Sequence, residues 1–147
     1  MKPLFIIPAR GGSKSIPKKN IKPFRGKPLI VWSILTALEL TDADRIIVTT
    51  DSDEIAQVAR EYGIPNPHMR PPELATDTAS TRDVLLDAMA QAERRGVDYD
   101  CVILLQPTSP LRTASDVRNA LAAMSTSGDQ AARALRTSEA VRKGDVG

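Results

Sequence analysis

The sequence predicts an α/β domain built around a doubly wound, mostly parallel β-sheet. Segments typical of strands alternate with segments typical of helices along most of the 147 residues, which is the pattern of a layered α/β structure. The main strand-like runs are continuously apolar rather than alternating, as expected for strands buried on both faces. A hydrophobic content of 41% in a chain of this length is sufficient for one domain with its own core.

Four apolar runs are the candidate strands. They lie at Leu4–Ile7, Arg45–Thr49, His68–Met69 and Asp100–Gln106. The run at His68 is weak, whereas the other three are continuous enough to form the centre of the sheet. Cys101, in the last of them, is expected to pack inside the sheet.

Four further segments are candidate helices. They are Pro28–Leu40, Asp53–Tyr62, Thr81–Arg95 and Ala114–Met124. The first is apolar on almost all sides, as a buried helix is, and the others place apolar residues three and four positions apart on one stripe. An Asp follows three residues after Ser80 and after Thr113, as in a capping box, and the glycines at 63 and 96 suit C-terminal caps.

The end of the chain has a different composition. We expect one domain over residues 1–124 and an atypical C-terminal tail over residues 125–147. The tail has no strong apolar run and no strand signal, although Ala131–Val141 is compatible with a short helix.

Composition excludes several classes of protein. A net charge of only +2 and an aromatic content of 3% argue against a nucleic-acid partner. One cysteine permits neither an intrachain disulfide nor a cysteine metal cluster. The longest mostly apolar stretch, Leu29–Leu38, is too short to span a bilayer, and the start lacks the pattern of a signal peptide. We therefore expect a cytoplasmic protein with no membrane partner.

Positive charge is concentrated near the start of the chain. Eight of the 20 Lys and Arg residues, and none of the 18 Asp and Glu residues, lie between Met1 and Leu38. Within this stretch a glycine-rich loop, Pro8–Asn20, follows the first strand. Ligands of α/β sheets bind beyond the carboxyl ends of the strands, and such loops present N–H groups and cations to phosphate. We expect a polyanionic small-molecule ligand, the alternative being a solvated basic loop.

Individual residues of this loop suit a triphosphate. Gly11 and Gly12 allow the backbone to approach it closely, Arg10 offers a planar fork to phosphate oxygens, and Lys14 offers a mobile point charge. The loop matches neither the Walker A pattern nor the Gly-x-Gly-x-x-Gly fingerprint. Ser13 lacks the Gly-x-Ser-x-Gly context of a hydrolase nucleophile.

Three blocks of sequence occur in a specific order. They are Pro8-Ala9-Arg10-Gly11-Gly12-Ser13-Lys14 with Pro17-x-Lys19-Asn20, then Arg70-Pro71-Pro72-Glu73-Leu74-Ala75-Thr76-Asp77-Thr78-Ala79-Ser80, then Leu104-Leu105-Gln106-Pro107-Thr108-Ser109-Pro110-Leu111-Arg112. Together they resemble the N-terminal portion of the CMP-sialic acid synthetases, or acylneuraminate cytidylyltransferases. The resemblance covers Met1–Met124 and implies a Rossmann-like sheet of the nucleotidyltransferase type, apparently truncated.

The resemblance also implies a reaction. The hydroxyl of a nine-carbon, sialic-type (nonulosonic) acid, N-acetylneuraminate or a relative, attacks the α-phosphorus of CTP, and pyrophosphate leaves with Mg²⁺. Arg10 and Lys14 would be catalytic because they neutralise the developing charge. The implied nucleotide-binding residues are Ala9, Arg10, Gly11, Gly12, Ser13, Lys14, Lys19, Asn20, Arg70, Ala79, Ser80 and Thr81. The implied sugar-binding residues are Gln106, Thr108 and Ser109.

Several of these residues have simpler explanations. Arg70, before two prolines, is alternatively an exposed surface residue. Ser80 caps a helix whether or not it touches a base. Thr108 and Ser109 lie between prolines and alternatively form a tight turn. Asp77 forms a turn, orients Arg70 or binds a metal ion indirectly.

Two residues outside the blocks also need an interpretation. Asp51 follows a strand and is interpreted as the N-cap of the Asp53–Tyr62 helix rather than as a Mg²⁺ ligand. His68 receives no role, because no carboxylate or second histidine lies near it in the sequence.

By the same resemblance, the family's later strand, its dimerisation element and its two Mg²⁺-binding aspartates lie beyond this chain. We therefore assign no metal-binding residue here. Three hypotheses remain open. The chain is an active cytidylyltransferase of a family that forms homodimers, or a truncated CTP-binding module with little or no turnover, or a non-enzymatic nucleotide binder.

Overall fold

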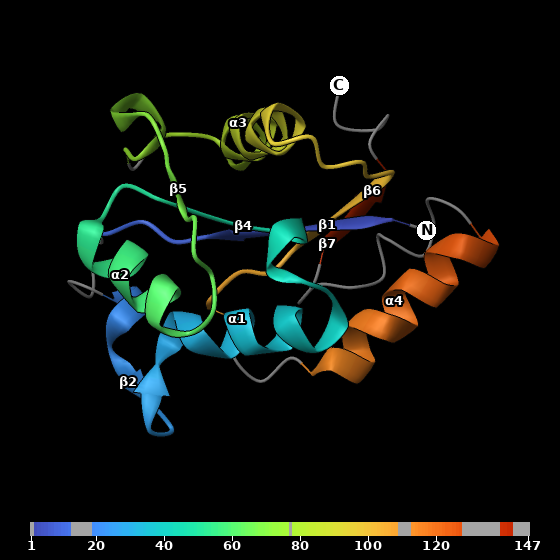
Figure 1. Cartoon of the computed structure of the whole chain (residues 1–147), viewed down its shortest axis with the longest axis horizontal. Coiled ribbons are helices and arrows are strands. Elements are labelled where there is room, and N and C mark those ends of the chain that lie inside the picture. Colours follow the sequence, from blue (N-terminus) through green and yellow to red (C-terminus); the bar gives the residue numbers. More distant parts are fainter. Residues whose placement is uncertain (1, 13–18, 77, 109–112, 128–138, 143–147) are drawn as a thin grey trace.

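A five-stranded sheet forms the centre of the domain (Figure 1), with the strand order β5-β4-β1-β6-β7. The computed structural model describes residues 2–12, 19–76, 78–108, 113–127 and 139–142. The strands are β1 (Pro3–Pro8), β4 (Ile46–Thr50), β5 (His68–Met69), β6 (Cys101–Leu104) and β7 (Glu139–Arg142). β1 is parallel to β4 and β6, and β4 to β5, while β7 is antiparallel to β6. The predicted mostly parallel α/β sheet is confirmed.

Helices cover both faces of this sheet (Figure 1). α1 (Leu29–Leu40), α2 (Asp53–Glu61) and α4 (Ala114–Ser127) lie on one face, and α3 (Thr81–Arg94) lies on the other. Their bounds follow the predicted ones closely, except that α4 continues past Met124. Within the described ranges, no helix combines the length and the apolar character needed to cross a membrane.

β1 is buried on both faces, which explains its continuously apolar sequence. Phe5 and Ile7 belong to a core cluster that includes residues of α1, α2 and α4, whereas Leu4 and Ile6 belong to a second cluster formed with α3. All four side chains are 0% exposed. Successive residues of a strand point to opposite faces, so a strand covered on both sides is apolar at every position.

The N-cap of α2 is Ser52 and not Asp51. Ser52 Oγ accepts a hydrogen bond from the amide of Ile55 at 3.3 Å. The interpretation of Asp51 as the cap is therefore wrong. Both residue types suit the position, but Asp51 is one residue too far from the first helical turn.

The other helix signals are confirmed. Ser80 Oγ accepts a hydrogen bond from the amide of Asp83 at 3.0 Å and so caps α3. Thr113 and Asp116 form a reciprocal capping box before α4, with amide-to-side-chain distances of 3.0 and 3.2 Å. The glycines after α2 and α3 have φ values of +105° and +77°, the left-handed conformation that suits a C-terminal cap.

A short hairpin between β1 and α1 was not predicted. Its strands are β2 (Pro23–Phe24) and β3 (Lys27–Pro28), joined by Arg25 and Gly26 at φ values of +50° and +87°. Two left-handed residues in succession are typical of the type I′ turn that matches the twist of a hairpin. Strands of two residues are too short to produce a periodic pattern.

The hairpin is attached to α1 through Trp32. The indole Nε1 donates a hydrogen bond to the carbonyl of Phe24 at 2.8 Å, and the two rings meet edge to face with centroids 6.5 Å apart. Lys27 Nζ lies 5.1 Å from the centroid of the indole ring. Polar and aromatic contacts together therefore hold this short element against the domain.

The expectation of no strand beyond Met124 is wrong. β7 pairs with β6 along its whole length, with Leu104 opposite Glu139 and Cys101 opposite Arg142. The helix expected over Ala131–Val141 is therefore absent from residues 139–141, and the rest of that segment lies outside the described residues. An antiparallel strand at the edge of a sheet needs no continuous apolar run, so the strand left no clear signal in the sequence.

Candidate active site

A cavity of about 320 Å³ lies where β1, β5 and β6 end. The residues before and after the start of α3 form its opposite side. Its lining consists of Pro8, Arg10, Arg70, Leu74, Thr76, Ala79, Thr81, Val84, Leu85, Leu104 and Gln106. The carboxyl edge of a parallel sheet is where α/β proteins bind ligands, and residues from all three sequence blocks meet there.

The loop after β1 is fixed by two hydrogen bonds. The amide of Ala9 donates to the carbonyl of Thr49 at 2.9 Å, and the amide of Gly11 donates to Asp51 Oδ1 at 2.8 Å. A Cβ on Gly11 would lie 2.8 Å from Cβ of Ser52. The glycine is thus required by close packing against the start of α2. Gly12 is different, because a Cβ there would meet nothing within 4 Å.

Asn20 connects the far end of this loop to its beginning. Its Nδ2 donates a hydrogen bond to the carbonyl of Arg10 at 2.8 Å. Lys19 and Asn20 begin the short 3₁₀ helix η1 (Lys19–Ile21) and are partly exposed. The side-chain amide of Asn20 therefore supports the loop directly. This role is separate from the nucleotide contact predicted for Asn20.

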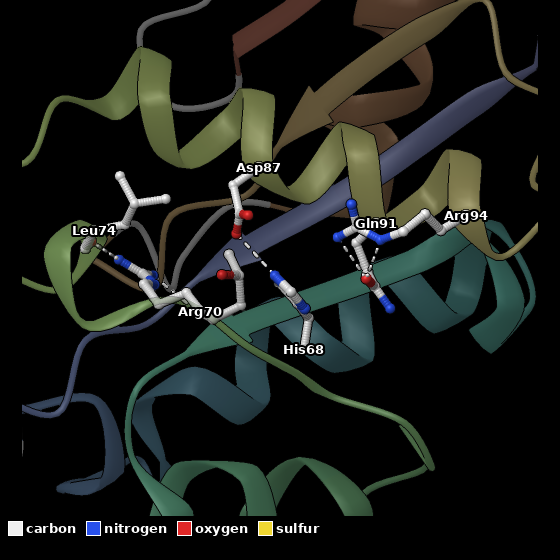
Figure 2. Close-up of polar contacts among 7 residues, drawn as sticks. His68, Arg70, Leu74, Asp87, Gln91 and Arg94 are labelled. Atoms are coloured by element: carbon white, nitrogen blue, oxygen red, sulfur yellow. Dashed lines mark hydrogen bonds and ion pairs between the residues drawn. The ribbon is translucent and has the colours of Figure 1, made fainter.

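Arg70 is a buried side chain, and two of its three guanidinium nitrogens donate to main-chain oxygens. Its residue exposure is only 8%, so the alternative of an exposed surface residue is wrong. Nη2 donates to the carbonyl of Thr49 at 2.8 Å, and Nη1 donates to the carbonyl of Leu74 at 3.1 Å (Figure 2). Nε is buried and has no hydrogen-bond partner among the described residues.

Burial also affects the pKa of this guanidinium. Desolvation lowers the pKa of Arg70, and the nearby carboxylate of Asp51 opposes that shift. Arginine nevertheless remains protonated in proteins. The cavity therefore has a fixed positive charge in its wall.

His68 contacts a carboxylate that the sequence did not reveal. Its Nε2 lies 2.8 Å from Asp87 Oδ2, and the two side chains are only 12% and 18% exposed (Figure 2). Asp87 is 19 residues further along the chain, in the middle of α3. The distance in sequence concealed the pair, although the predicted strand and helix belong to adjacent layers of the domain, the sheet with β5 and the helical layer with α3.

The remaining predicted site residues are placed as follows. Ala79 and Thr81 line the cavity on either side of Ser80, whose hydroxyl caps α3. Gln106 lines the cavity, whereas Thr108 is exposed and is not part of its lining. Ser13, Lys14, Asp77 and Ser109 lie outside the described residues.

The described residues do not fit a metal site held by the protein alone. They contain no group of three or more His, Cys, Asp and Glu side chains that could hold a metal ion. Asp51, the carboxylate nearest the loop, already accepts the hydrogen bond from the amide of Gly11. No cage for Mg²⁺ is therefore formed by this part of the chain.

A Rossmann-like sheet, a basic glycine-rich loop after its first strand and a cavity at its carboxyl edge define an α/β nucleotidyltransferase. The family model of the cytidylyltransferases matches residues 4–144, and the chain belongs to this family. The match extends past Met124, where we expected the resemblance to end.

Two curated relatives are similar to this chain in sequence. It is 43% identical over 121 residues to the CMP-N,N'-diacetyllegionaminic acid synthase of Legionella pneumophila, covering 82% of this chain and 52% of that protein. It is 45% identical over 111 residues to the pseudaminic acid cytidylyltransferase of Campylobacter jejuni, covering 76% of this chain and 48% of that protein. The chain thus spans about half the length of each of these two curated relatives.

Solved structures share the fold. A CMP:2-keto-3-deoxy-manno-octonic acid synthetase complexed with CTP superposes with a TM-score of 0.69 at 26% identity, covering 88% of this chain and 49% of that chain. A cytidylyltransferase from Leptospira borgpetersenii has a TM-score of 0.63 at 19% identity, covering 87% of this chain and 51% of that one. The predicted nucleotidyltransferase fold is confirmed.

Proposed function

We propose that this chain carries the CTP site of a cytidylyltransferase that activates a nine-carbon sugar acid. The products are the CMP-sugar and pyrophosphate. One observation carries the proposal: five residues predicted for nucleotide or sugar, namely Arg10, Arg70, Ala79, Thr81 and Gln106, line the same cavity. Four of them come from the three separate sequence blocks, and Thr81 directly follows the second block.

The shape and lining of the cavity suit a nucleoside. Leu74, Val84, Leu85 and Leu104 give it apolar walls, and Arg70 adds a buried cation. Its volume of about 320 Å³ is at the lower end of small-molecule sites. We therefore assign the base and ribose to the cavity, with Ala79 and Thr81 beside the base and Gln106 between nucleotide and sugar acid.

The triphosphate is assigned to the loop after β1. Arg10 lies at the junction of the loop and the cavity. When the hydroxyl of the sugar acid attacks the α-phosphorus, the bond to the pyrophosphate oxygen breaks and negative charge accumulates on the leaving group. Arg10 and Lys14 would stabilise that charge electrostatically, and the amides of the loop would position the phosphates.

The substrates and setting proposed for the whole protein rest on the relatives. Two of them are named for legionaminic and pseudaminic acids, so we propose N-acetylneuraminate or another nonulosonic acid as acceptor. We further propose that Mg²⁺ accompanies CTP, that the protein works in the cytoplasm, and that it forms a homodimer. Thr108 and Ser109 are proposed for the sugar-acid side of the site.

A second candidate is a CTP-binding module with little or no turnover. It is favoured by the composition of the described residues, which contain no group of three or more His, Cys, Asp and Glu side chains that could hold a metal ion. Two measurements separate the candidates. Calorimetry with CTP, UTP, GTP and ATP in the presence of Mg²⁺ tests the nucleotide site. Release of pyrophosphate from CTP in the presence of N-acetylneuraminate, legionaminic acid or pseudaminic acid tests turnover.

The outcomes are distinct. Selective CTP binding with pyrophosphate release supports the enzyme, and selective binding without release supports the module. Binding of no nucleotide would refute both candidates for this chain.

A further inference from the structure

We propose that His68 is a positioning residue for the cavity, acting through its contact with Asp87. The contact holds the wall that carries Arg70 and the wall formed by α3 in one fixed arrangement. This inference rests on the proposed function, since it assigns the cavity to the nucleotide.

The wall that carries Arg70 has little support from the sheet. β5 has two residues and lies at the edge of the sheet, where β4 is its single strand partner among the described residues. The amide of Arg70 extends this pairing by one hydrogen bond, to the carbonyl of Thr50 at 2.9 Å. Short edge strands with few ladder bonds open easily, so a side-chain contact to another layer has a large effect on their position.

Asp87 supplies that contact from the opposite wall. It lies in α3 one turn after Val84 and two residues after Leu85, both of which line the cavity. His68 lies two residues before Arg70, so both side chains are on the same face of the edge strand. Figure 2 shows the Asp87 side chain extending from α3 toward the imidazole of His68. The pair therefore spans the two layers immediately beside the cavity.

The position of Arg70 also matters for the phosphate loop. The carbonyl of Thr49 accepts hydrogen bonds from Arg70 Nη2 at 2.8 Å and from the amide of Ala9 at 2.9 Å. Thr49 is at the same time the register partner of His68. A shift of β5 away from α3 would consequently disturb both the buried guanidinium and the carbonyl that anchors the loop.

The chemistry of the contact is directional. An ionised carboxylate only accepts hydrogen bonds, so Nε2 of His68 carries the hydrogen. With both side chains mostly buried, the hydrogen bond is stronger than it would be in water, and an unpaired partner is costly. Glutamine can present an amide N–H at nearly the position of Nε2, whereas leucine can present nothing.

The test compares His68→Gln and His68→Leu with the wild type. Arg94→Gln is the matched control, because within the described part of the chain the side chain of Arg94 contacts Gln91 of the same helix at an exposed position. Losing one partly buried hydrogen bond should weaken CTP binding by about five- to tenfold in His68→Leu. His68→Gln and Arg94→Gln should bind CTP within about twofold of the wild type.

Hydrogen exchange of the Arg70 amide provides a readout that needs no ligand. It should be faster in His68→Leu than in the wild type, and unchanged in the other two variants. A His68→Leu variant that is folded, binds CTP normally and protects the Arg70 amide would overturn the proposal. So would a His68→Gln variant as defective as His68→Leu, because a recoverable hydrogen bond would then be irrelevant. If the wild-type chain binds no nucleotide, the proposed function fails. Hydrogen exchange of the Arg70 amide still decides whether the contact between His68 and Asp87 holds the wall in place.

Discussion

Asp51 Oδ1 accepts a hydrogen bond from the amide of Gly11 at 2.8 Å. The carboxylate that follows β4 thereby fixes the loop that follows β1, 40 residues earlier in the chain. A carboxylate beside a loop assigned to phosphate is electrostatically unfavourable for the ligand, so its value here is geometric.

Asp51→Asn should preserve CTP binding or improve it, because the amide oxygen still accepts the hydrogen bond and the negative charge is gone. Asp51→Ala should weaken binding by about three- to tenfold, the usual value of one hydrogen bond. Titration calorimetry with CTP measures both. Equal affinities for the two variants would contradict the geometric role of Asp51.

Gly11→Ala should lower the free energy of unfolding by about 1–3 kcal/mol, the usual cost of overpacking, because the new methyl group meets Cβ of Ser52 at 2.8 Å. Gly12→Ala is the control, since its methyl group has no neighbour within 4 Å. The control should change the free energy of unfolding by less than about 0.5 kcal/mol. Urea unfolding distinguishes them, and similar losses in both variants would be inconsistent with close packing at Gly11.

Arg10→Ala should weaken CTP binding by about 1.5–3 kcal/mol, the range for hydrogen bonds to a charged group. Binding of cytidine, which has no phosphate, should be unaffected. Comparing the two ligands in one titration series isolates the phosphate contact. If cytidine and CTP lost affinity equally, Arg10 would instead belong to the nucleoside part of the site.

Arg70→Lys should fail to replace the wild-type residue despite keeping the charge. The guanidinium reaches the carbonyls of Thr49 and Leu74 from two separate nitrogens, and a single ammonium group cannot reproduce that fork. We expect the variant to unfold at lower urea concentration and to bind CTP at least about tenfold more weakly. Wild-type behaviour of Arg70→Lys would show that charge alone is sufficient.

Stability should decline as the pH rises above about 9. Burial, assisted by Asp100, raises the pKa of the Cys101 thiol from 9.0 to about 12. The unfolded chain therefore loses the thiol proton at a pH where the folded chain retains it, which favours unfolding between pH 9 and 12. Urea unfolding at pH 8, 9 and 10 should show a steeper decline for wild type than for Cys101→Ala. Equal slopes would contradict the burial of the thiol.

Tyr99 adds to this decline at slightly higher pH. Burial, together with Glu93, raises the pKa of its phenol from 10.0 to about 12. The decline that Tyr99 causes should therefore persist in Cys101→Ala, with its stabilisation lost between pH 10 and 12. Urea unfolding of Cys101→Ala extended to pH 11 measures it, and an unchanged stability between pH 10 and 11 would contradict the raised pKa of Tyr99.

Most of the central fold could be predicted from the sequence because burial imposes a pattern. β1 is covered on both faces and reads as an unbroken apolar run, and α3 reads as a single apolar stripe. The hairpin at Arg25–Gly26 and strand β7 were not predicted. The first has strands of only two residues, and the second is an antiparallel edge, so neither has a periodic signal of adequate length.

The candidate site was predictable to the extent that topology gathers it. Arg10, Arg70 and Gln106 follow three parallel strands, so they had to meet at one edge of the sheet. What the sequence could not provide was the use of main-chain oxygens. The two donors on the carbonyl of Thr49 are invisible in a residue pattern, as is the pairing of His68 with a carboxylate on another layer.

Trp32 is the single tryptophan of the chain, and its indole is held between the hairpin carbonyl of Phe24 and the ammonium group of Lys27. The hairpin begins just after η1, whose Asn20 supports the carbonyl of Arg10. Intrinsic fluorescence of this protein is therefore a local signal rather than an average over several sites. The wavelength of its emission maximum reports whether the β2–β3 hairpin, next to the phosphate loop, is packed against α1. No external dye is needed to follow this packing.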